Sequence, residues 1–403
     1  MNKTGEKMFK KLLMAILFCA LGVPNFLAQG KADAKQFLSL DISRFYDSSH
    51  HWYDITDQDK VIHARENHPK YKTDEITKIA DNILLFQKSN GGWPKNYDML
   101  AVLTDQQKDS VAKARNILNT TFDNGTTHSQ LTYLAEVYSI TKDEKYKVAF
   151  LKGLDFIFTA QYPNGGWPQF YPQMRGYARH ITFNDGAMIG VMDLLKNILD
   201  GKPDYSFVDQ SYREKTKKAF DKGVDCILKC QIKEKGKLLA WCQQHDEKNY
   251  KPVWARTFEP PSICNGESCG IVEMLMSIDN PSKEIINSIQ GAVKWFEDSK
   301  ILNTRLETIK APREKFLYQT NSIDRVAVHD TTAPPIWTRF YELKTHRPLF
   351  CDRGRKIYYS LDKVSRERRS GYMYYISDPQ KVLDMYPAWQ KKWAPENNVL
   401  QTN

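Results

Sequence analysis

The sequence predicts an all-α fold, an α/α toroid (an incomplete α/α barrel) with long functional loops and few short strands. Two observations support this prediction. Apolar residues recur at helical spacing through most of the chain after residue 72, and one eight-residue motif occurs twice, at 87–94 and 161–168.

The apolar spacing predicts each helix in turn. In residues 74–89 the side chains of Ile76, Ile79 and Ile83 fall on one face of a helix. Loops rich in Gly, Pro and Asn separate the segments, so each is expected to form its own helix. Similar stripes occur at 129–141, 145–160, 186–199, 209–231, 267–278, 282–298 and 331–343.

The repeated motif indicates how these helices are connected. It reads Gln-Lys-Ser-Asn-Gly-Gly-Trp-Pro at 87–94 and Gln-Tyr-Pro-Asn-Gly-Gly-Trp-Pro at 161–168. Each copy follows a helical stripe, so its Gly pair can end the helix with positive φ while Trp and Pro cover the helix end. A repeat that spans several helices predicts helix–loop units arranged in a toroid. Because terpenoid cyclases carry a similar Gln-x-x-x-Gly-x-Trp pattern, the motif indicates architecture and not substrate.

The N-terminus is typical of a signal peptide, which we assign to residues 1–30. Four lysines precede the apolar run 12–21, and small residues follow at 28–30. A membrane anchor is the alternative, but the run is short for a bilayer. We therefore expect a protein that is exported, periplasmic or secreted, with no membrane span after signal removal. The rest divides into an N-terminal extension (31–71), a catalytic domain (72–385) and a C-terminal tail (386–403).

Charge and cysteine content bear on the partners. The formal net charge is +10, and removing residues 1–29, with four Lys and one Glu, leaves about +7. A basic exported protein favours an acidic polysaccharide over nucleic acid as its partner. Export also permits disulfides, with the pairing left open, and a zinc site is the competing interpretation although no standard zinc spacing is present. The six cysteines outside the signal peptide are Cys226, Cys230, Cys242, Cys264, Cys269 and Cys351.

Four loop segments, at 121–128, 182–186, 254–261 and 335–341, concentrate polar residues beside Gly, Pro and aromatics. Asp123 and Asp185 each stand beside Asn and Gly before an apolar helix. Each is either a helix cap or, if the two loops converge, a ligand for a hard cation such as calcium.

The same segments hold positive charges. Arg256 and Arg339 lie beside prolines and aromatics, and an arginine fork suits a carboxylate. Lys95 follows the first Gly-Gly-Trp-Pro and adds another charge. The alternative is that these are solvated surface charges, with Arg256 weakly paired to Glu259.

Several long motifs in one order resemble the pectate lyases of polysaccharide lyase family ten. They are Asn-Gly-Gly-Trp-Pro-Lys (90–95), Thr-Phe-Asp-Asn-Gly-Thr-Thr (121–127), Tyr-Pro-Asn-Gly-Gly-Trp-Pro-Gln-Phe-Tyr-Pro (162–172), Ile-Thr-Phe-Asn-Asp-Gly-Ala-Met (181–188) and Trp-Ala-Arg-Thr-Phe-Glu-Pro-Pro-Ser (254–262). The resemblance runs from about Lys72 to Leu349. It implies an α/α toroid, calcium dependence and eliminative cleavage of polygalacturonate.

The resemblance also implies roles for individual residues. Asp123 and Asp185 match calcium-site carboxylates, Arg256 the catalytic arginine base, and Arg339 the arginine that binds the substrate carboxylate. Lys95 and Thr257 stand in the same motifs and are expected to contact the substrate. The expected partners are polygalacturonate and pectin oligosaccharides, with the enzyme a monomer.

The chemistry explains these residue types. Elimination removes the proton at C5 of galacturonate, next to a carboxylate, so cations must offset the charge that develops. An arginine base is demanding because free guanidinium is always protonated near neutral pH, and a strongly alkaline optimum would follow. His128, His245 and Lys251 are the alternative bases.

Two other function classes remain open on sequence alone. A glycoside hydrolase on this architecture would need two facing carboxylates, such as Asp123 with Asp185 or Glu259 with Glu267. A non-catalytic protein that binds acidic polysaccharide would keep Arg339 but tolerate the loss of Arg256. A terpenoid cyclase is weaker, because its Asp-rich motifs are missing.

Overall fold

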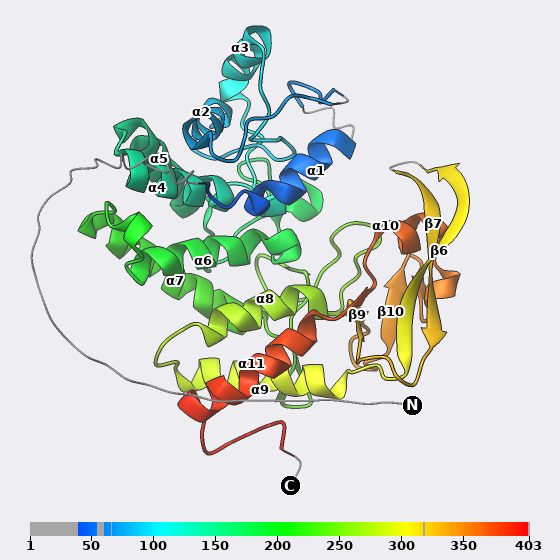
Figure 1. Cartoon of the computed structure of the whole chain (residues 1–403). Helices are drawn as coiled ribbons and strands as arrows, with labels where there is room; N and C mark the ends of the chain where they lie inside the picture. Colours follow the sequence, from blue (N-terminus) through cyan, green and yellow to red (C-terminus); the bar gives the residue numbers. More distant parts are fainter. Residues whose placement is uncertain (1–38, 55–59, 66, 317–318, 402–403) are drawn as a thin grey trace, which may run out of the picture. The chain divides into compact units, whose positions relative to one another are not determined.

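The computed structural model describes residues 39–54, 60–65, 67–316 and 319–401, and Ser39–Asn403 form one compact unit. The sequence-predicted signal peptide lies outside the described residues. The fold is an α/α toroid of stacked helix pairs (Figure 1). Its helices are α1 (Tyr46–Asp54), α2 (Ile76–Phe86), α3 (Asp105–Lys113), α4 (His128–Thr141), α5 (Glu144–Ala160), α6 (Ala187–Leu199), α7 (Gln210–Cys230), α8 (Asn265–Met276), α9 (Lys283–Asp298), α10 (Arg366–Gly371) and α11 (Asp378–Trp393).

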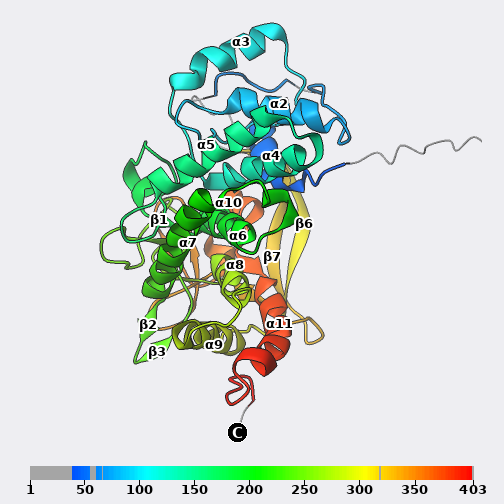
Figure 2. The same ribbon diagram turned by 90° about the vertical axis from the view of Figure 1, so that its left-hand side faces the viewer.

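The helices form two rows. Helices α2, α5, α7 and α9 are the outer row, and each contacts the next. Helices α4, α6 and α8 are the inner row, packed against one another and each against an outer helix, as in the pairs α4–α5, α6–α7 and α8–α9 (Figure 2). Helix α11 packs on α8 and α9. The helices predicted from the stripes up to residue 298 are therefore confirmed within a few residues at each end.

A glutamine and a tryptophan close the C-terminal end of the outer helices. Trp93 Nε1 donates to Ile83 O of α2 at 2.7 Å, and Gln87 Nε2 donates both to Gly91 O (2.9 Å) and to Ala149 O of α5 (2.8 Å). Each glutamine thus connects one outer helix to the next. The second sequence copy repeats this geometry with Trp167 on Ile157 O and Gln161 on Gly165 O and Ala219 O.

Two further copies of this arrangement have no Gly pair. Trp241 Nε1 donates to Ile227 O of α7, and Gln231 Nε2 reaches Leu239 O and Ser288 O of α9. Trp337 Nε1 closes α9 through Phe296 O. In the two recognisable copies the first glycine has positive φ. A Cβ on Gly91 would stand 2.3 Å from Lys152 O, so only glycine lets the loop approach α5 this closely.

The two long strands β6 (Thr304–Lys315) and β7 (Thr320–His329) form an antiparallel hairpin, with α10 packed on β7. The other strands are two to four residues long: β1 (Ile181–Thr182), β2 (Lys233–Glu234), β3 (Lys237–Leu238), β4 (Gln244–His245), β5 (Ile263–Cys264), β8 (Trp337–Thr338), β9 (Phe340–Tyr341), β10 (Pro348–Cys351), β11 (Ile357–Tyr358) and β12 (Tyr375–Ile376). They pair in the orders β11–β10–β9–β5, β12–β8, β1–β4 and β2–β3. Strands β6, β7, β9 and β10 lie together on one side of the helices (Figure 1), whereas the short β2–β3 hairpin contacts α9 (Figure 2).

The helix predicted at 331–343 is wrong, because this segment forms β8 and β9. Pro334 and Pro335 disfavour helical backbone in the residues that precede them, so a helix cannot run on from residue 331. The apolar residues that follow are buried in two short strands, which helical spacing does not distinguish from a helix. The structure also places Phe45 and Trp52 of the predicted N-terminal extension in the main core, and α11 continues through residue 386.

Cysteine pairing, left open by the sequence, is resolved for the described residues, where all six cysteines are free and buried. No helix in this part of the chain combines the length and apolar character needed to cross a membrane.

The glutamine contact generates a stability prediction. Gln87→Ala removes the donor to Gly91 O and Ala149 O and leaves buried carbonyls without it, so the free energy of unfolding should fall by about 1–3 kcal/mol. Urea denaturation measures this change. Gln210→Ala is the matched control, since Gln210 is exposed and its side chain donates to Glu214 on the same helix. Equal effects of the two substitutions would contradict the role given to Gln87.

Candidate active site

Two equivalent turns begin the site, one before α4 and one before α6. They are the 3₁₀ turns Asp123–Gly125 and Asn184–Gly186, which contact each other. In each turn the second residue has left-handed backbone, with φ 52° at Asn124 and 50° at Asp185, a conformation that Asn and Asp tolerate better than other side chains. The first turn has Asp123 followed by Asn124, and the second has Asn184 followed by Asp185, so each turn supplies one carboxylate and one amide.

Asp123 is buried and held by two donors. Lys95 Nζ lies 2.5 Å from Asp123 Oδ2, and Gln169 Nε2 donates to Oδ1 at 2.9 Å. Burial opposes ionisation of Asp123, but Lys95, Gln169 and Arg256 outweigh it and lower the pKa of this carboxyl. Asp123 is therefore a carboxylate with its own counterion.

Asp185 has a different environment. Burial raises the pKa of Asp185 to about 7, with the charge of Asp123 adding to the effect while Arg256 and Arg339 oppose it. Its Oδ2 lies 3.6 Å from Arg256 Nη2 and 3.1 Å from Asn184 Nδ2. Oδ1 accepts no hydrogen bond from the described residues, which leaves an oxygen available to a ligand.

Arg256 is fixed by Glu259, a residue that is completely buried. Glu259 accepts from Arg256 Nε at 2.8 Å, Nη2 at 2.5 Å and the backbone N–H at 3.0 Å, and also from the Tyr372 hydroxyl at 3.0 Å. The pair is not the weak surface contact considered from sequence. Although burial acts in the opposite direction, Glu259 and Asp185 raise the pKa of Arg256 well above its usual value.

Arg339 lies between β8 and β9. Its Nη2 contacts Glu267, in the first turn of α8, and Asn184 Oδ1 at 3.3 Å. The guanidinium carbon lies 4.8 Å from the centre of the Tyr372 ring, and Nε is buried without a partner. Arg339 therefore joins the second turn to α8 and keeps an unused donor.

The structure thus brings together five of the six predicted residues, Lys95, Asp123, Asp185, Arg256 and Arg339. Thr257 is exposed and donates no side-chain hydrogen bond to described residues.

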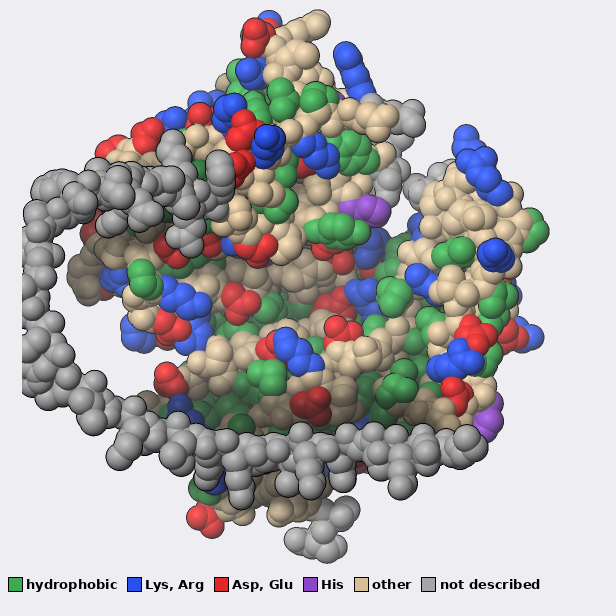
Figure 3. Space-filling view, in the orientation of Figure 1, with side chains coloured by type: hydrophobic (Ala, Val, Ile, Leu, Met, Phe, Trp, Pro, Cys, Tyr) green, Lys and Arg blue, Asp and Glu red, His purple; other side chains and the backbone are tan. Residues whose placement is uncertain are grey.

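Hollows extend from Asp185 in two directions. One of about 710 Å³ is bounded by residues including Arg44, His128 and Asp193, and another of about 300 Å³ by Glu267 and Arg339. Side chains of both charge signs are visible between the helices and the β6–β7 hairpin (Figure 3). A further hollow of about 750 Å³ beside α9 contains none of the candidate residues.

The turns suit a hard cation. Two carboxylates and two amide groups in contacting turns are the oxygen ligands that calcium prefers, and Asp185 Oδ1 has no competing donor among the described residues. Three positive charges, on Lys95, Arg256 and Arg339, also act on these carboxylates, and they suit an anionic ligand.

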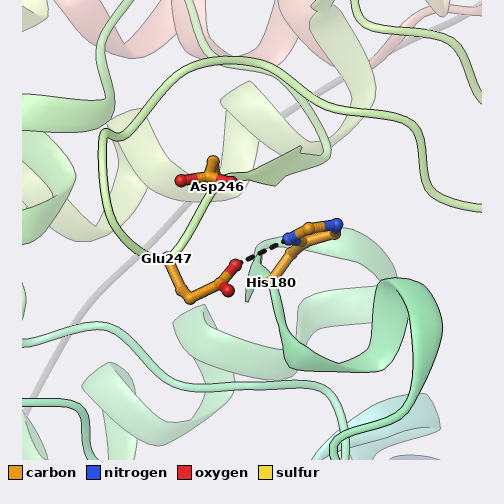
Figure 4. A group of neighbouring side chains, drawn as sticks. All are labelled: His180, Asp246 and Glu247. Carbon is orange, nitrogen blue, oxygen red and sulfur yellow. Dashed lines mark hydrogen bonds and ion pairs between the residues drawn. The ribbon is translucent and has the colours of Figure 1, made fainter.

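A separate group of ligand-type side chains lies away from these turns. His180, Asp246 and Glu247 have ligand atoms within 4.8 Å of one another (Figure 4), so this group could hold a metal ion. However, Glu247 already binds His180 Nδ1 at 2.9 Å and Arg179 Nε at 3.1 Å, and Asp246 Oδ1 accepts two backbone N–H groups. These contacts suit a structural clamp.

Comparison with known proteins now decides the family. Residues 87–383 match the pectic acid lyase family. The chain belongs to this family. A family 10 polysaccharide lyase from Cellvibrio cellulosa is 32% identical with a TM-score of 0.66, covering 77% of this chain and 91% of that one. A variant of that lyase with one aspartate changed to alanine, in complex with trigalacturonic acid, is 31% identical with a TM-score of 0.66, covering 77% and 92%. A search of curated proteins gave no match.

Two of the alternative bases are poor candidates in this pectic acid lyase. Both nitrogens of His245 are engaged, with Cys242 N and Tyr250 O. Burial lowers the pKa of His128 to about 4, and its ring lies against Gly190, where a Cβ would come within 2.2 Å. A base with so low a pKa is weak.

Sequence reasoning gave no structural role to three residues of the site. Glu259 was considered only as a weak partner or hydrolase carboxylate, although its position three residues after Arg256 was visible. Gln169 lies within the motif at 162–172, but a single glutamine in a loop does not indicate a contact with an aspartate. Tyr372 is distant in sequence from every motif.

His128 generates a pH prediction. Because its folded pKa is about 4 and the unfolded value about 6.5, the unfolded chain binds more protons between these values. Stability is therefore lost as pH falls through this window, by about 2 kcal/mol between pH 7 and pH 5. In His128→Asn this contribution disappears, so urea denaturation should show a correspondingly smaller loss. Exposed His63→Asn is the control, and a pH dependence unchanged in His128→Asn would contradict the assignment.

Proposed function

We propose that this lyase cleaves de-esterified polygalacturonate by β-elimination, with calcium as its metal and Arg256 as the base. The observation that carries the proposal is the convergence of Arg256 and Arg339 on the turn that holds Asp185, next to the turn that holds Asp123. Family membership supports the reaction class, and the bound trigalacturonic acid of the Cellvibrio lyase supports the substrate.

The roles follow from the charge that develops at C5. Removal of the C5 proton leaves negative charge beside the uronate carboxylate, and this charge must be neutralised in the transition state. Asp123 and Asp185 would hold a calcium ion, which supplies positive charge to the substrate carboxylate. Arg339 has an unpartnered Nε and a fork that suits the same carboxylate. Lys95 and Thr257 are proposed as further substrate contacts.

The proposed reaction balances as follows. The C5 proton passes to neutral Arg256, the C5–H electron pair forms the C4–C5 double bond, and the C4–O bond breaks. The leaving oxygen takes a proton from water, and the hydroxide that forms takes the C5 proton from Arg256, which restores the neutral base. The products are a shortened chain and an unsaturated uronide that absorbs in the ultraviolet.

Export and a monomeric state complete the proposal. Export depends on residues 1–30, which lie outside the described residues, and it agrees with a polymeric substrate found outside cells.

The activity itself is tested with polygalacturonate. We expect ultraviolet absorbance to rise with added calcium and to stop with a chelator. Arg256→Lys should lower kcat by about 100-fold or more with the fold retained, since a positioned proton-transfer group contributes this much or more. Exposed Arg347→Lys is the control and should retain normal activity. New reducing ends without absorbance would indicate hydrolysis, and full activity in Arg256→Lys would exclude Arg256 as the base.

The pH dependence tests the base directly. Glu259 and Asp185 raise the pKa of Arg256 well above the usual value of an arginine side chain, so the neutral fraction of Arg256 rises about tenfold per pH unit throughout the measurable range. The logarithm of kcat should therefore increase with a slope near +1 and show no plateau up to about pH 10. Steady-state assays at saturating calcium and substrate measure this slope. A plateau near neutral pH would assign the proton transfer to another group.

A further inference from the structure

Tyr177 lies beside the charged residues of the site, although none of the site motifs includes it. It belongs to the 3₁₀ turn Gly176–Arg179. The neighbouring Ala178 O accepts the Gln169 N–H at 2.9 Å, and the Gln169 side chain binds Asp123. Two short links therefore connect Tyr177 to the carboxylate of the first turn.

The Tyr177 side chain is close enough to Lys95 and Arg256 to feel their charges, but it forms no hydrogen bond or ring contact with the described part of the chain. It is 39% exposed, its ring makes no aromatic or cation–π contact, and its hydroxyl makes no hydrogen bond. Partial burial of the hydroxyl raises the pKa of Tyr177, and the charges of Lys95 and Arg256 oppose this effect without outweighing it. The hydroxyl therefore stays protonated. In the proposed function these charged groups bind an anionic sugar, so the exposed Tyr177 ring beside them is available to contact the same ligand.

We propose that the ring of Tyr177 is a platform on which a galacturonate ring packs next to the scissile bond. A sugar ring has an apolar C–H face and polar edges. A tyrosine supplies a large amphipathic surface at low entropic cost, while the uronate carboxylate is directed to the arginines. This inference rests on the proposed cleavage of polygalacturonate at the Asp123–Asp185 turns.

The clamp at Glu247 positions this platform. Its carboxylate binds His180, the third residue after Tyr177 (Figure 4). It also accepts from Arg179, the second residue after Tyr177. The Tyr162 hydroxyl also donates to Arg179 O at 2.5 Å, and Asn164 Nδ2 to Glu247 O at 2.9 Å. Ordering the turn before substrate arrives lowers the entropic cost of binding. Glu247 is a positioning residue that acts through Tyr177.

Binding and turnover test the platform separately. In an Arg256→Ala background, calorimetry with trigalacturonate and calcium should show that Tyr177→Ala raises Kd about tenfold, whereas Tyr177→Phe changes it by less than about twofold. In the parent enzyme, Tyr177→Ala should raise KM for polygalacturonate more than it lowers kcat. Tyr359→Ala is the matched control, because Tyr359 is 43% exposed and contacts Glu342 and Arg347, away from the site.

Three outcomes would overturn the inference. They are an unchanged Kd in Tyr177→Ala, an equal loss in Tyr177→Phe, and an equal loss in Tyr359→Ala. Because Kd is measured without turnover, a failure of the proposed reaction would appear in the absorbance assay and leave this result readable.

A double-mutant cycle tests the clamp. Glu247→Gln should raise KM about threefold, and adding it to Tyr177→Ala should cause no further increase, since both act through the same ring. Fully additive effects would show that Glu247 does not act through Tyr177.

Discussion

A tryptophan indole that donates to the last turn of each outer helix is the contact on which the site depends. Trp93, Trp167, Trp241 and Trp337 make this bond at the ends of α2, α5, α7 and α9. Each bond fixes the loop against the last turn of its helix, at the point where the chain reverses direction. The inner helices α4, α6 and α8 consequently begin at the same end of the fold, and Asp123, Asp185 and Glu267 are carried there together.

The second constraint is electrostatic. Glu259 is completely buried and Arg256 only partly, so removing the Glu259 carboxylate from water costs desolvation free energy, which good geometry and additional hydrogen bonds must offset. Glu259 accepts three hydrogen bonds from Arg256 and one from Tyr372, so the geometry is nearly complete. The main role of the pair is to position Arg256. Its guanidinium group is held 3.6 Å from Asp185, whose other oxygen stays available to a ligand.

The sequence was sufficient where local pattern and global packing agree. The stripes predicted the rows of helices, and the Gly-Gly-Trp motif predicted the helix ends. The motif did not reveal the third tryptophan contact, because the β2–β3 hairpin lengthens the loop between Gln231 and Trp241. It did not reveal the fourth either, because the β6–β7 hairpin separates Trp337 from α9. The β6–β7 hairpin was also missed, since its strands are largely exposed and lack the alternation of a half-buried sheet.

The candidate site divides in the same way. Motifs identified the acids and arginines, but partner choice depends on packing between distant segments. Glu259 and Tyr372 are 113 residues apart, and no local pattern links them. Tyr177 was invisible because an exposed tyrosine in a loop is ordinary until its charged neighbours are known.

Lys95 shows what that hidden pairing means for the proposed chemistry. Sequence assigned Lys95 to the substrate and Asp123 to the metal, as separate roles, yet the two side chains form a 2.5 Å ion pair. A cation that binds Asp123 would neutralise part of its negative charge and so weaken the ion pair between Asp123 and Lys95. The ammonium group is then released beside the site, where an anionic sugar needs positive charge. In the proposed function, cation binding and substrate binding are therefore favourable to each other through one shared carboxylate.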